Sequence, residues 1–352
     1  MNTKKKYVIG LMSGTSLDGL DLVYVSFEKN INFVFNILAA KTYSYSDIWV
    51  HKLKSAFNKN LNELSELDLE YGESLGNLIN LFIEEFQIDN IDFISSHGHT
   101  IFHKPNEGVT LQIGNGLVIS QITNQKVVCD FRTQDVKFGG QGAPLVPIGD
   151  ELLFNEFHYC LNLGGFANIS FNCLGQRMAF DICPVNIVLN HYTRKINLEY
   201  DDEGSISSKG EINNQLLNRL NNLPFYQDEK PKSLGYEFIV TEIIPLIDEF
   251  SLSTENILRT FIEHIVIQIS NKIKFEGQLL ITGGGVFNKF LIKQLESKVE
   301  NQIIIPNELL INFKEALIFA FLGLLRVDNQ VNCLKSVTGA KKDHSSGKIY
   351  KP

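Results

Sequence analysis

The hydrophobic positions of the chain first form short strand-like runs joined by tight turns, and then longer runs with helical spacing. In the first half, three strand-like runs cover residues 7–12, 20–27 and 33–45. They are rich in β-branched and aromatic residues and are bounded by turn-forming residues, as strands are. Apolar residues with helical spacing then cover 46–58 and 61–86. This order predicts three consecutive antiparallel strands followed by two helices.

Beyond these helices, short strands and helices alternate. Predicted strands cover 91–95, 110–113 and 127–131, a predicted helix covers 116–123, and a glycine-rich segment over 138–144 interrupts the pattern. The second half then repeats the order of the first. Its predicted strands cover 159–163, 167–172, 177–182, 278–281 and 303–305, and its predicted helices cover 185–196, 211–222, 237–250, 254–275, 288–299 and 314–326.

Two halves with the same order of elements predict a duplicated α/β fold. Three antiparallel strands followed by β–α crossovers give a mixed sheet that is covered by helices. We therefore expect two lobes with a central cleft, an N-terminal lobe over 1–145 and a C-terminal lobe over 146–352. The length of 352 residues agrees with this division, because single domains typically have about 50–250 residues.

Composition narrows the classes of function. The net charge of −8 argues against non-specific binding of nucleic acid, which depends on a basic surface. The apolar run near the N-terminus is shorter than the core of a signal peptide, and no stretch reaches the ~18 apolar residues of a membrane span. The five cysteines include no C-x-x-C pair, which favours free thiols in a reducing compartment over a disulfide framework or a zinc site. We expect a cytoplasmic protein that acts on a small molecule.

Three glycine-rich turns directly follow predicted strands. They read SGTSLDG over 13–19, LGGFAN over 163–168 and TGGGVFN over 282–288. Glycine suits phosphate binding because a Cβ would keep phosphate away from the backbone N–H groups. Thr15 and Ser16 can add hydrogen bonds from their hydroxyl groups. A tight turn alone explains any one of these segments, and none matches a Walker A or G-x-G-x-x-G motif. Three such turns in two repeated halves favour a nucleotide site.

Two carboxylates are candidates for chemistry. Asp181 lies near the end of a predicted strand, just before Pro184 and Asn186, which should open a helix. A carboxylate in that place faces the edge of a sheet where ligands bind, although it could instead cap the helix. Asp18 follows the first glycine turn and could hold Mg²⁺ through water, or form an Asx turn.

Polar residues also follow two strands of the first half. Arg132 lies in DFRTQD and could bind a substrate carboxylate through two hydrogen bonds, or pair with Asp130 or Asp135. His97 and His99 lie in SHGHT. They could ligate a metal ion or contact a sugar, and because no further cluster of ligands appears we favour the sugar.

These segments resemble a known family. GLMSGTSLDGLD, SHGHTIFHKP, LQIGNG, DFRTQD, GGQGAPLVP, LNLGGFANIS, FDICPVN and ITGGGVFNKFL occur in the order seen in the anhydro-N-acetylmuramic acid kinases, from the superfamily of sugar kinases, chaperone ATPases and actin. The resemblance covers roughly residues 7–340 and implies two RNase-H-like lobes of the actin-like ATPase type. It also implies that 1,6-anhydro-N-acetylmuramic acid is opened with water and phosphorylated by Mg-ATP on its 6-oxygen. The products are N-acetylmuramic acid 6-phosphate and ADP.

The resemblance also assigns roles to residues. Asp181 is similar to the base that activates water at the anomeric carbon. The expected ATP contacts are Gly14, Thr15, Ser16, Leu17, Asp18, Gly19, Leu20, Asp21, Gly164, Gly165, Gly283, Gly284 and Gly285, and the expected substrate contacts are His97, Asp130, Arg132 and Glu315.

The sequence departs from the family pattern in two places. Where members read F-D-C-G-P-G-N, this chain has FDICPVN over 180–186 and lacks both glycines. Where S-H-G-Q-T is usual, His99 replaces the glutamine. Two other functions therefore stay open, a kinase of the same fold for another sugar or amino sugar, and a nucleotide-binding regulator without catalysis. A homodimer is a further expectation.

Overall fold

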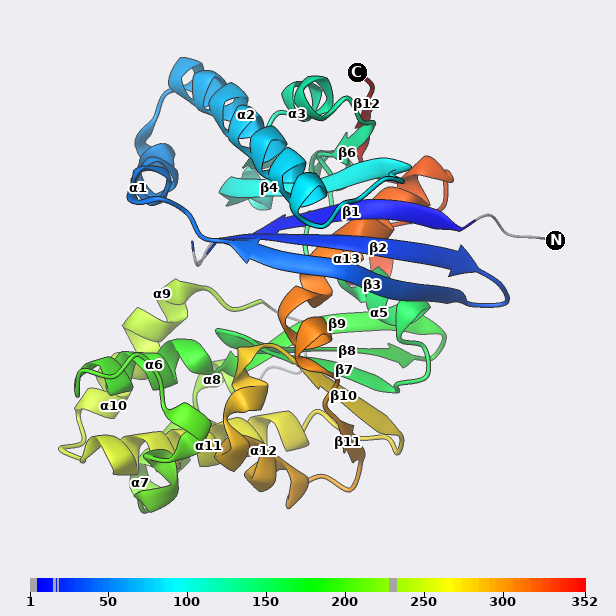
Figure 1. The fold of residues 1–352 in the computed structure, drawn as a ribbon. Coiled ribbons are helices and arrows are strands. Elements are labelled where there is room, and N and C mark those ends of the chain that lie inside the picture. The colour runs from blue at the N-terminus through cyan, green and yellow to red at the C-terminus, as the bar shows by residue number, and fades with distance from the viewer. Residues whose placement is uncertain (1–4, 15–16, 18, 228–232) are drawn as a thin grey trace. The chain divides into compact units, whose positions relative to one another are not determined.

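The computed structural model describes residues 5–14, 17, 19–227 and 233–352. By its internal contacts the chain divides into two units, one made of Met1–Leu153 with Phe313–Pro352 and the other of Phe154–Asn312. We call them unit 1 and unit 2 and describe each by itself (Figure 1). Helix α13, Glu308–Val327, begins in the residues of unit 2 and ends in those of unit 1.

Unit 1 is built on a mixed sheet. Its order is β12-β6-β4-β1-β2-β3, with β5 paired to β4. β1, β2 and β3 pair antiparallel, whereas β4 runs parallel to both β1 and β6. The strands are β1 Lys6–Ser13, β2 Leu20–Lys29, β3 Phe33–Tyr43, β4 Phe93–Lys104, β5 Val109–Ile113, β6 Val127–Cys129 and β12 Lys348–Tyr350.

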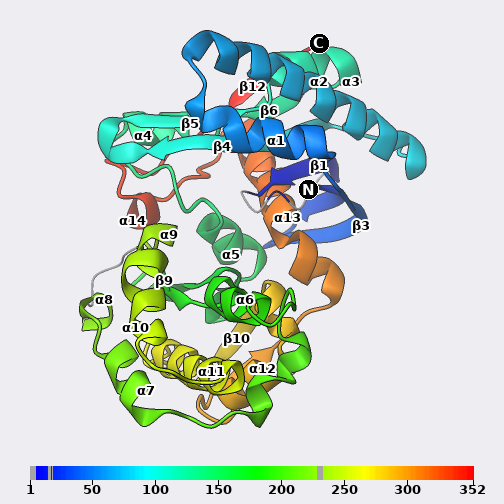
Figure 2. The same cartoon turned by 90° about the vertical axis from the view of Figure 1, so that its left-hand side faces the viewer.

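Helices cover both faces of this sheet. α2 and α3 lie side by side (Figures 1 and 2) and share a core with Ile9 and Leu11 of β1. Gly10 lies between these residues on the opposite face, where a Cβ would come within 2.3 Å of the Ala316 carbonyl oxygen of α13. The helices are α1 Asp47–Ser55, α2 Leu61–Glu85, α3 Gly116–Thr123, α4 Thr133–Lys137, α5 Pro147–Leu153 and α14 Lys335–Thr338, with 3₁₀ turns at Ala56–Asn58 and Pro105–Glu107.

Side-chain caps fix the start of two long helices, α2 in unit 1 and α13, which begins in unit 2. Asn60 accepts hydrogen bonds from the backbone N–H groups of Asn62 and Glu63, and the Glu63 carboxylate accepts one from the N–H of Asn60, so α2 begins with a capping box. Asn307 accepts from the N–H of Leu310 at the start of α13.

Unit 2 repeats the architecture with five strands. The order is β11-β10-β7-β8-β9, with β7, β8 and β9 antiparallel and with β10 parallel to both β7 and β11. The strands are β7 Tyr159–Leu163, β8 Phe166–Cys173, β9 Gln176–Pro184, β10 Gln278–Thr282 and β11 Gln302–Ile304. The helices are α6 Asn186–Arg194, α7 Asn214–Asn221, α8 Pro224–Gln227, α9 Tyr236–Phe238, α10 Ile244–Asp248, α11 Thr254–Ser270 and α12 Lys289–Glu296, with 3₁₀ turns at Asp202–Gly204, Ser207–Lys209 and Gly284–Phe287.

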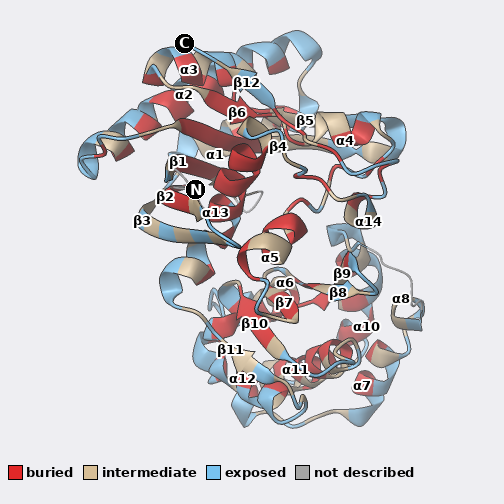
Figure 3. Ribbon diagram, turned by 90° about the vertical axis from the view of Figure 1, so that its right-hand side faces the viewer, coloured by how far each residue is buried: buried red, intermediate tan, exposed pale blue. Residues whose placement is uncertain are grey.

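The predicted duplication is confirmed. The order β3-β2-β1-β4-β6 in unit 1 matches β9-β8-β7-β10-β11 in unit 2, with the same strand directions. Most residues of the central strands β1 and β7 are buried (Figure 3). Within the described residues, no helix has the length and hydrophobicity that a membrane crossing requires.

Three expectations need correction. The contacts place 146–153 and 313–352 with unit 1, whereas the sequence pattern predicts them in the C-terminal lobe, because α13 packs on β1 and β12 pairs with β6. The strand predicted over 91–95 extends through both histidines to Lys104, because β5 pairs with its second half. The helix predicted over 237–250 is α9 and α10 joined by a π-helical turn at Ile239–Ile243.

Candidate active site

Two glycine turns of unit 2 lie next to each other. Gly164–Gly165 follows β7 and Gly283–Gly285 follows β10, and these two strands are parallel neighbours. A Cβ at Gly283 would lie 2.6 Å from the Asn162 side chain and 2.8 Å from the backbone of Leu163. The two turns therefore touch at the carboxyl edge of the sheet, where ligands bind in α/β folds.

The glycines of these turns differ in what surrounds them. Gly283 has φ 85°, and a Cβ at Gly285 would lie 2.7 Å from that of Leu163, so both are required by the packing of the turns. A Cβ added at Gly284 would have the Asn186 amide nitrogen as its nearest neighbour, 3.8 Å away, and one added at Gly165 would have Cβ of Ile187, also 3.8 Å away. These two glycines border open space, as a bound phosphate or ribose would require.

The Gly164–Gly165 turn is held by residues at the start of α6, the helix that follows β9. The N–H groups of Val185 and Asn186 donate to the carbonyl oxygens of Gly165 and Gly164, at 2.8 and 3.3 Å. The amide of Asn186 also donates to the Leu163 carbonyl at 3.3 Å. The segment that lacks the two expected glycines therefore still fixes the Gly164–Gly165 turn.

Asp181 lies on β9 opposite Asn168 of β8, next to a bulge. Its Oδ2 accepts a hydrogen bond from the backbone N–H of Leu234 at 2.8 Å. Burial raises the pKa of the Asp181 carboxyl, and the Leu234 N–H partly opposes this rise. Helix α6 starts after Val185, and among the described residues no side chain caps it. The alternative in which Asp181 caps this helix is therefore wrong.

The first glycine loop, in unit 1, is described only in part. Thr15, Ser16 and Asp18 lie outside the described residues. The N–H of Leu17 donates to the Gly14 carbonyl at 3.3 Å. A Cβ at Gly19 would lie 2.7 Å from the Tyr43 carbonyl, so this glycine lets β2 approach β3.

Arg132 and His97 form one hydrogen-bonded group in unit 1. Arg132 donates to His97 Nε2 from Nε at 3.1 Å and from one terminal nitrogen at 3.0 Å, and its other terminal nitrogen donates to the Gly142 carbonyl at 3.0 Å. Because Nε2 accepts, the proton of His97 is on Nδ1, which donates to the Gly98 carbonyl. Burial, and then the charge of Arg132, hold the pKa of His97 well below its usual range. The histidine stays neutral and orients the guanidinium.

The two carboxylates among the expected substrate contacts, Asp130 and Glu315, have different surroundings. Asp130 has φ 57° and forms an ion pair of 2.7 Å with Lys348 of β12, so the predicted alternative of pairing with Arg132 is wrong for this residue. Glu315 lies exposed on α13. Desolvation by nearby protein raises its pKa, the charge of Arg132 opposes that rise, and the charge of Asp21 adds to it.

Sequence reasoning missed a buried polar network beside the first loop. Ser13 Oγ lies 2.8 Å from His99 Nδ1 and 2.7 Å from the Tyr45 hydroxyl, and the Tyr45 and Tyr71 hydroxyls are 2.6 Å apart. Burial lowers the pKa of His99 to about 4, so the ring is neutral near pH 7. Tyr45 and Tyr71 belong to no glycine or charge motif, and only the pairing of Ser13 with His99 across β1 and β4 brings the group together.

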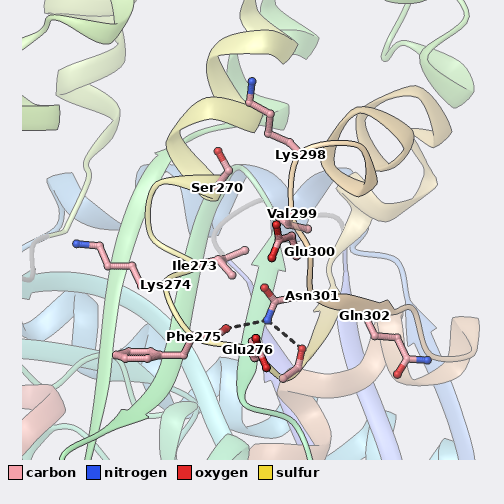
Figure 4. A pocket seen from close by; sticks show the side chains of 11 residues that line it. Ser270, Ile273, Lys274, Phe275, Glu276, Lys298, Val299, Glu300, Asn301 and Gln302 are labelled. Atoms are coloured by element: carbon pink, nitrogen blue, oxygen red, sulfur yellow. Dashed lines mark hydrogen bonds between the residues drawn. The ribbon is translucent and has the colours of Figure 1, made fainter.

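An open pocket of about 560 Å³ in unit 2 has none of the candidate site residues of that unit in its lining. Figure 4 shows its lining between the end of α11 and the start of β11, where the Asn301 amide donates to the carbonyls of Phe275 and Gly277 at 2.9 Å. These residues precede β10 and β11, whereas the glycine turn follows β10. The pocket therefore belongs to the opposite edge of the sheet from the candidate site.

Comparison with known proteins decides the family. The family model described as anhydro-N-acetylmuramic acid kinase matches residues 6–352. The chain belongs to this family. An anhydro-N-acetylmuramic acid kinase from Haemophilus influenzae is 32% identical, covering 99% of each chain, and one from Shewanella denitrificans is 34% identical, again covering 99% of each. Membership of the anhydro-N-acetylmuramic acid kinase family agrees with the resemblance that the sequence motifs indicate.

Solved structures resemble the chain more distantly. An activator of 2-hydroxyisocaproyl-CoA dehydratase from Clostridium difficile, with bound ADPNP, is 14% identical with a TM-score of 0.44, covering 90% of this chain and 92% of that one. A ROK family glucokinase from Streptomyces griseus, in complex with glucose and AMPPNP, is 10% identical with a TM-score of 0.41, covering 90% and 98%. Similarity of this size carries no argument about the site.

Proposed function

We propose that the chain is an ATP-dependent kinase that opens 1,6-anhydro-N-acetylmuramic acid with water and phosphorylates its 6-oxygen, as part of cell-wall recycling. The match to the anhydro-N-acetylmuramic acid kinase family over residues 6–352 carries this proposal. The buried carboxylate of Asp181, on the strand that leads into the segment that holds the Gly164–Gly165 turn, supports it on chemical grounds. A regulator without catalysis would not need such a group.

In the proposed reaction Asp181 takes a proton from water. The water oxygen bonds to the anomeric carbon, and the bond from that carbon to the 6-oxygen breaks. The freed 6-oxygen then bonds to the γ-phosphorus of ATP, ADP leaves, and the proton passes from Asp181 to solvent. A base works best when its pKa lies nearer the working pH, and burial moves the pKa of Asp181 in that direction.

The nucleotide is proposed to bind at the glycine turns. The open sides of Gly165 and Gly284 would admit phosphate or ribose close to the backbone, and Gly283 and Gly285 hold the turns together. Gly14, Leu17, Gly19, Leu20 and Asp21, with Thr15, Ser16 and Asp18 outside the described residues, stay the predicted first phosphate loop.

Mg²⁺ is proposed to accompany ATP. This ion prefers oxygen ligands and keeps several waters in phosphate sites. Asp18, the predicted ligand, is outside the described residues. Among the described residues, Asp21 and Glu315 fit the need, because they are two carboxylates close enough for the charge of one to raise the pKa of the other. A divalent cation would relieve that repulsion.

The sugar is proposed to contact unit 1 through His97, Asp130, Arg132 and Glu315. His97 occupies the edge of the Arg132 guanidinium formed by Nε and one terminal nitrogen. The two terminal nitrogens of Arg132 carry four N–H groups in total. One N–H donates to the Gly142 carbonyl and one to His97 Nε2, so two N–H groups remain for the carboxylate of the substrate. This arrangement favours an acidic sugar over a neutral one, which weighs against the alternative of a kinase for another, uncharged sugar.

The setting of the reaction is also part of the proposal. ATP is available in the cytoplasm, and all five cysteines are free thiols, which suits a reducing compartment. We therefore propose a cytoplasmic enzyme. The homodimer stays a prediction.

One experiment tests the reaction as a whole. The chain is incubated with ATP, Mg²⁺ and 1,6-anhydro-N-acetylmuramic acid in water labelled with heavy oxygen, and the product is analysed by mass spectrometry. We expect a phosphorylated sugar with one heavy oxygen at the anomeric carbon, provided the reaction is stopped before that position exchanges with solvent. A phosphorylated product without the label, or no product, would contradict the proposal. Phosphorylation of a neutral amino sugar at a higher kcat/KM would favour the alternative.

A further inference from the structure

Three different potential metal ligands meet in unit 1, and the proposed reaction assigns none of them a role. Oxygen of Asp135, sulfur of Cys333 and nitrogen of His344 lie within 4.8 Å of one another, and all three residues are buried. Asp135 lies on α4, whereas the other two lie on the segment between α13 and β12. The cluster therefore joins parts of the chain that are far apart in the sequence.

The backbone fixes two of the three groups side by side. Cys333 and His344 form an isolated antiparallel bridge in which each N–H donates to the carbonyl of the other residue, at 3.1 Å. Residues directly opposite each other in such a pair place their side chains on the same face. Sulfur and imidazole are thus brought together without the C-x-x-C spacing of common zinc motifs.

The imidazole of His344 has the orientation of a metal ligand. Its Nδ1 lies 3.1 Å from the Lys342 carbonyl, to which it donates, so in the neutral ring Nε2 has a lone pair. Nε2 is buried and, among the described residues, lacks a hydrogen-bond partner. Metal-bound histidines typically donate their other N–H to a backbone carbonyl or carboxylate, which fixes the ring.

The carboxylate of Asp135 is also held from outside the cluster. Oδ1 accepts from the Thr338 hydroxyl at 2.8 Å, and Oδ2 accepts from the Gly142 N–H at 2.7 Å. Each oxygen has two lone pairs, so one on Oδ1 remains for an ion. The supporting hydrogen bonds that metal ligands need are therefore already made for both the aspartate and the histidine.

We propose that Asp135, Cys333 and His344 form a binding site for one Zn²⁺ ion in unit 1. Thiolate, imidazole and carboxylate are the ligands that zinc uses, and three of them leave one position of a tetrahedron for water. Binding replaces the S–H bond of Cys333 with a Zn–S bond and releases the proton to solvent. The two negative ligands then balance the charge of the ion.

The structure sets three demands on the site. Ligand atoms around zinc lie about 3.5 Å apart. His344 Nε2 and Asp135 Oδ1 already have this separation, at 3.5 Å, and the other separations, which are at most 4.8 Å, must shorten by no more than about 1 Å when the ion binds. Burial, and then the charge of Asp135, raises the pKa of the Cys333 thiol, so the Zn–S bond must offset the cost of removing its proton. The positive charge of Arg132 also acts on Cys333 and opposes a cation. In return, the ion would tie the segment between α13 and β12 to α4, just after the proposed substrate contact Arg132.

A competing arrangement needs no metal. In it, Nε2 of His344 carries a proton and faces Oδ1 of Asp135 at 3.5 Å as an ion pair. That distance is long for a hydrogen bond. The two arrangements differ in whether the untagged protein takes up a metal with a sulfur ligand.

Cobalt is the probe, because Co²⁺ takes the place of Zn²⁺ and shows a sulfur-to-metal absorption band. The untagged chain, stripped with chelator, is titrated with Co²⁺ and then with Zn²⁺. We expect one Co²⁺ per chain, with a sulfur charge-transfer band and a tetrahedral visible spectrum that Zn²⁺ abolishes. The same sample with Zn²⁺ should unfold at a higher temperature.

Variants locate the site. Cys333→Ser should lose the sulfur band, His344→Gln should weaken Co²⁺ binding at least ~10-fold, and Cys173→Ser, a half-buried thiol of unit 2, should behave like the parent. Circular dichroism without metal checks that each variant is folded. Loss of the sulfur band in folded Cys333→Ser, or weaker Co²⁺ binding by folded His344→Gln, is sufficient to locate the site. Absence of a sulfur band in the parent at excess Co²⁺ would overturn the proposal. So would a band that survives in folded Cys333→Ser.

Discussion

The carboxylate of Asp181 accepts a hydrogen bond from the backbone N–H of Leu234, 2.8 Å away. This contact makes a clean test of the role of Asp181, because an asparagine oxygen can accept the same hydrogen bond. A substitution to asparagine therefore removes the negative charge and the basicity while leaving the contact in place.

We predict that Asp181→Asn lowers kcat by at least ~10². Binding of ATP, measured by calorimetry, should be unchanged, because Asp181 acts on water and not on the nucleotide. Asp202→Asn, an exposed aspartate of unit 2, serves as the matched control and should keep full activity. Near-normal turnover in a folded Asp181→Asn protein would remove Asp181 from the mechanism.

The pKa of Asp181 predicts the pH dependence of the enzyme. The carboxyl must be ionised to act as a base, and burial raises its pKa. The kcat/KM of the parent should therefore fall as the pH drops through this raised pKa, above the usual range of an aspartate. The stability of the fold should change in the opposite direction. Folding raises the pKa of this carboxyl, so its ionisation lowers the free energy of unfolding as the pH increases. Asp181→Asn should thus unfold at the same temperature as the parent or higher at pH 7, and a large fall would indicate a structural role.

Substitutions in the third glycine turn should separate ligand contact from packing. Gly284 borders open space, so Gly284→Val should fold normally and weaken ATP binding at least ~10-fold. Gly285 touches Leu163, so Gly285→Ala should lower the unfolding temperature. Gly284→Ala is the mild control. Calorimetry with ATP and thermal unfolding measure the two effects, and unchanged ATP binding by folded Gly284→Val would contradict the proposed nucleotide position.

Arg132→Lys should weaken binding of the sugar more than binding of ATP. Lysine keeps the charge but loses the planar group that His97 and Gly142 orient. A charge-assisted hydrogen bond is worth about 1.5–3 kcal/mol, so KM for the sugar should increase at least ~10-fold. Arg194→Lys, at an exposed ion pair with Glu199, is the control. Steady-state kinetics with each substrate varied in turn will show whether only the sugar is affected, and an equal change for ATP would argue against a sugar contact.

His99 should make unit 1 sensitive to acid. Burial lowers its pKa from 6.5 to about 4, so the unfolded chain binds the proton more readily and stability falls as the pH drops below 6.5. Between pH 7 and about pH 5 this amounts to about 2 kcal/mol. His99→Gln, the residue usual in the family, should lose that sensitivity. Urea unfolding followed by fluorescence of Trp49, which contacts Tyr71 in unit 1, measures it. If the free energy of unfolding falls equally at acid pH in the parent and in His99→Gln, groups other than His99 cause the acid sensitivity.

Much of the fold follows from local patterns in the sequence. The run of β-branched and aromatic residues in β2 and the capped, helical spacing of α2 are local signals, and both elements were predicted within a few residues. The extension of β4 through His97 and His99 was not, because it depends on β5 as a partner. The short helices α4 and α5 and the strand β12 were missed, since each is too short for periodicity to show.

The candidate site was predicted in part. Glycine turns and Asp181 stand beside recognisable strands, so their placement could be inferred. The contact of Arg132 with His97, and the network of Ser13, Tyr45 and Tyr71, depend on which strands become neighbours. Pairing between distant segments is not encoded in any single window of sequence.

The two halves of the sequence suggest that unit 1 is complete before unit 2 is synthesised. This is not so, because β12, the last strand of the chain, belongs to the sheet of unit 1. The ribosome releases all of residues 154–312 before the segment that pairs with β6 exists. During that interval the edge of β6 lacks its partner strand, and unpaired sheet edges invite association with other chains. Unit 1, whose residues are synthesised first, is therefore completed last. All residues of unit 2 are available for folding before β12 of unit 1 has been synthesised.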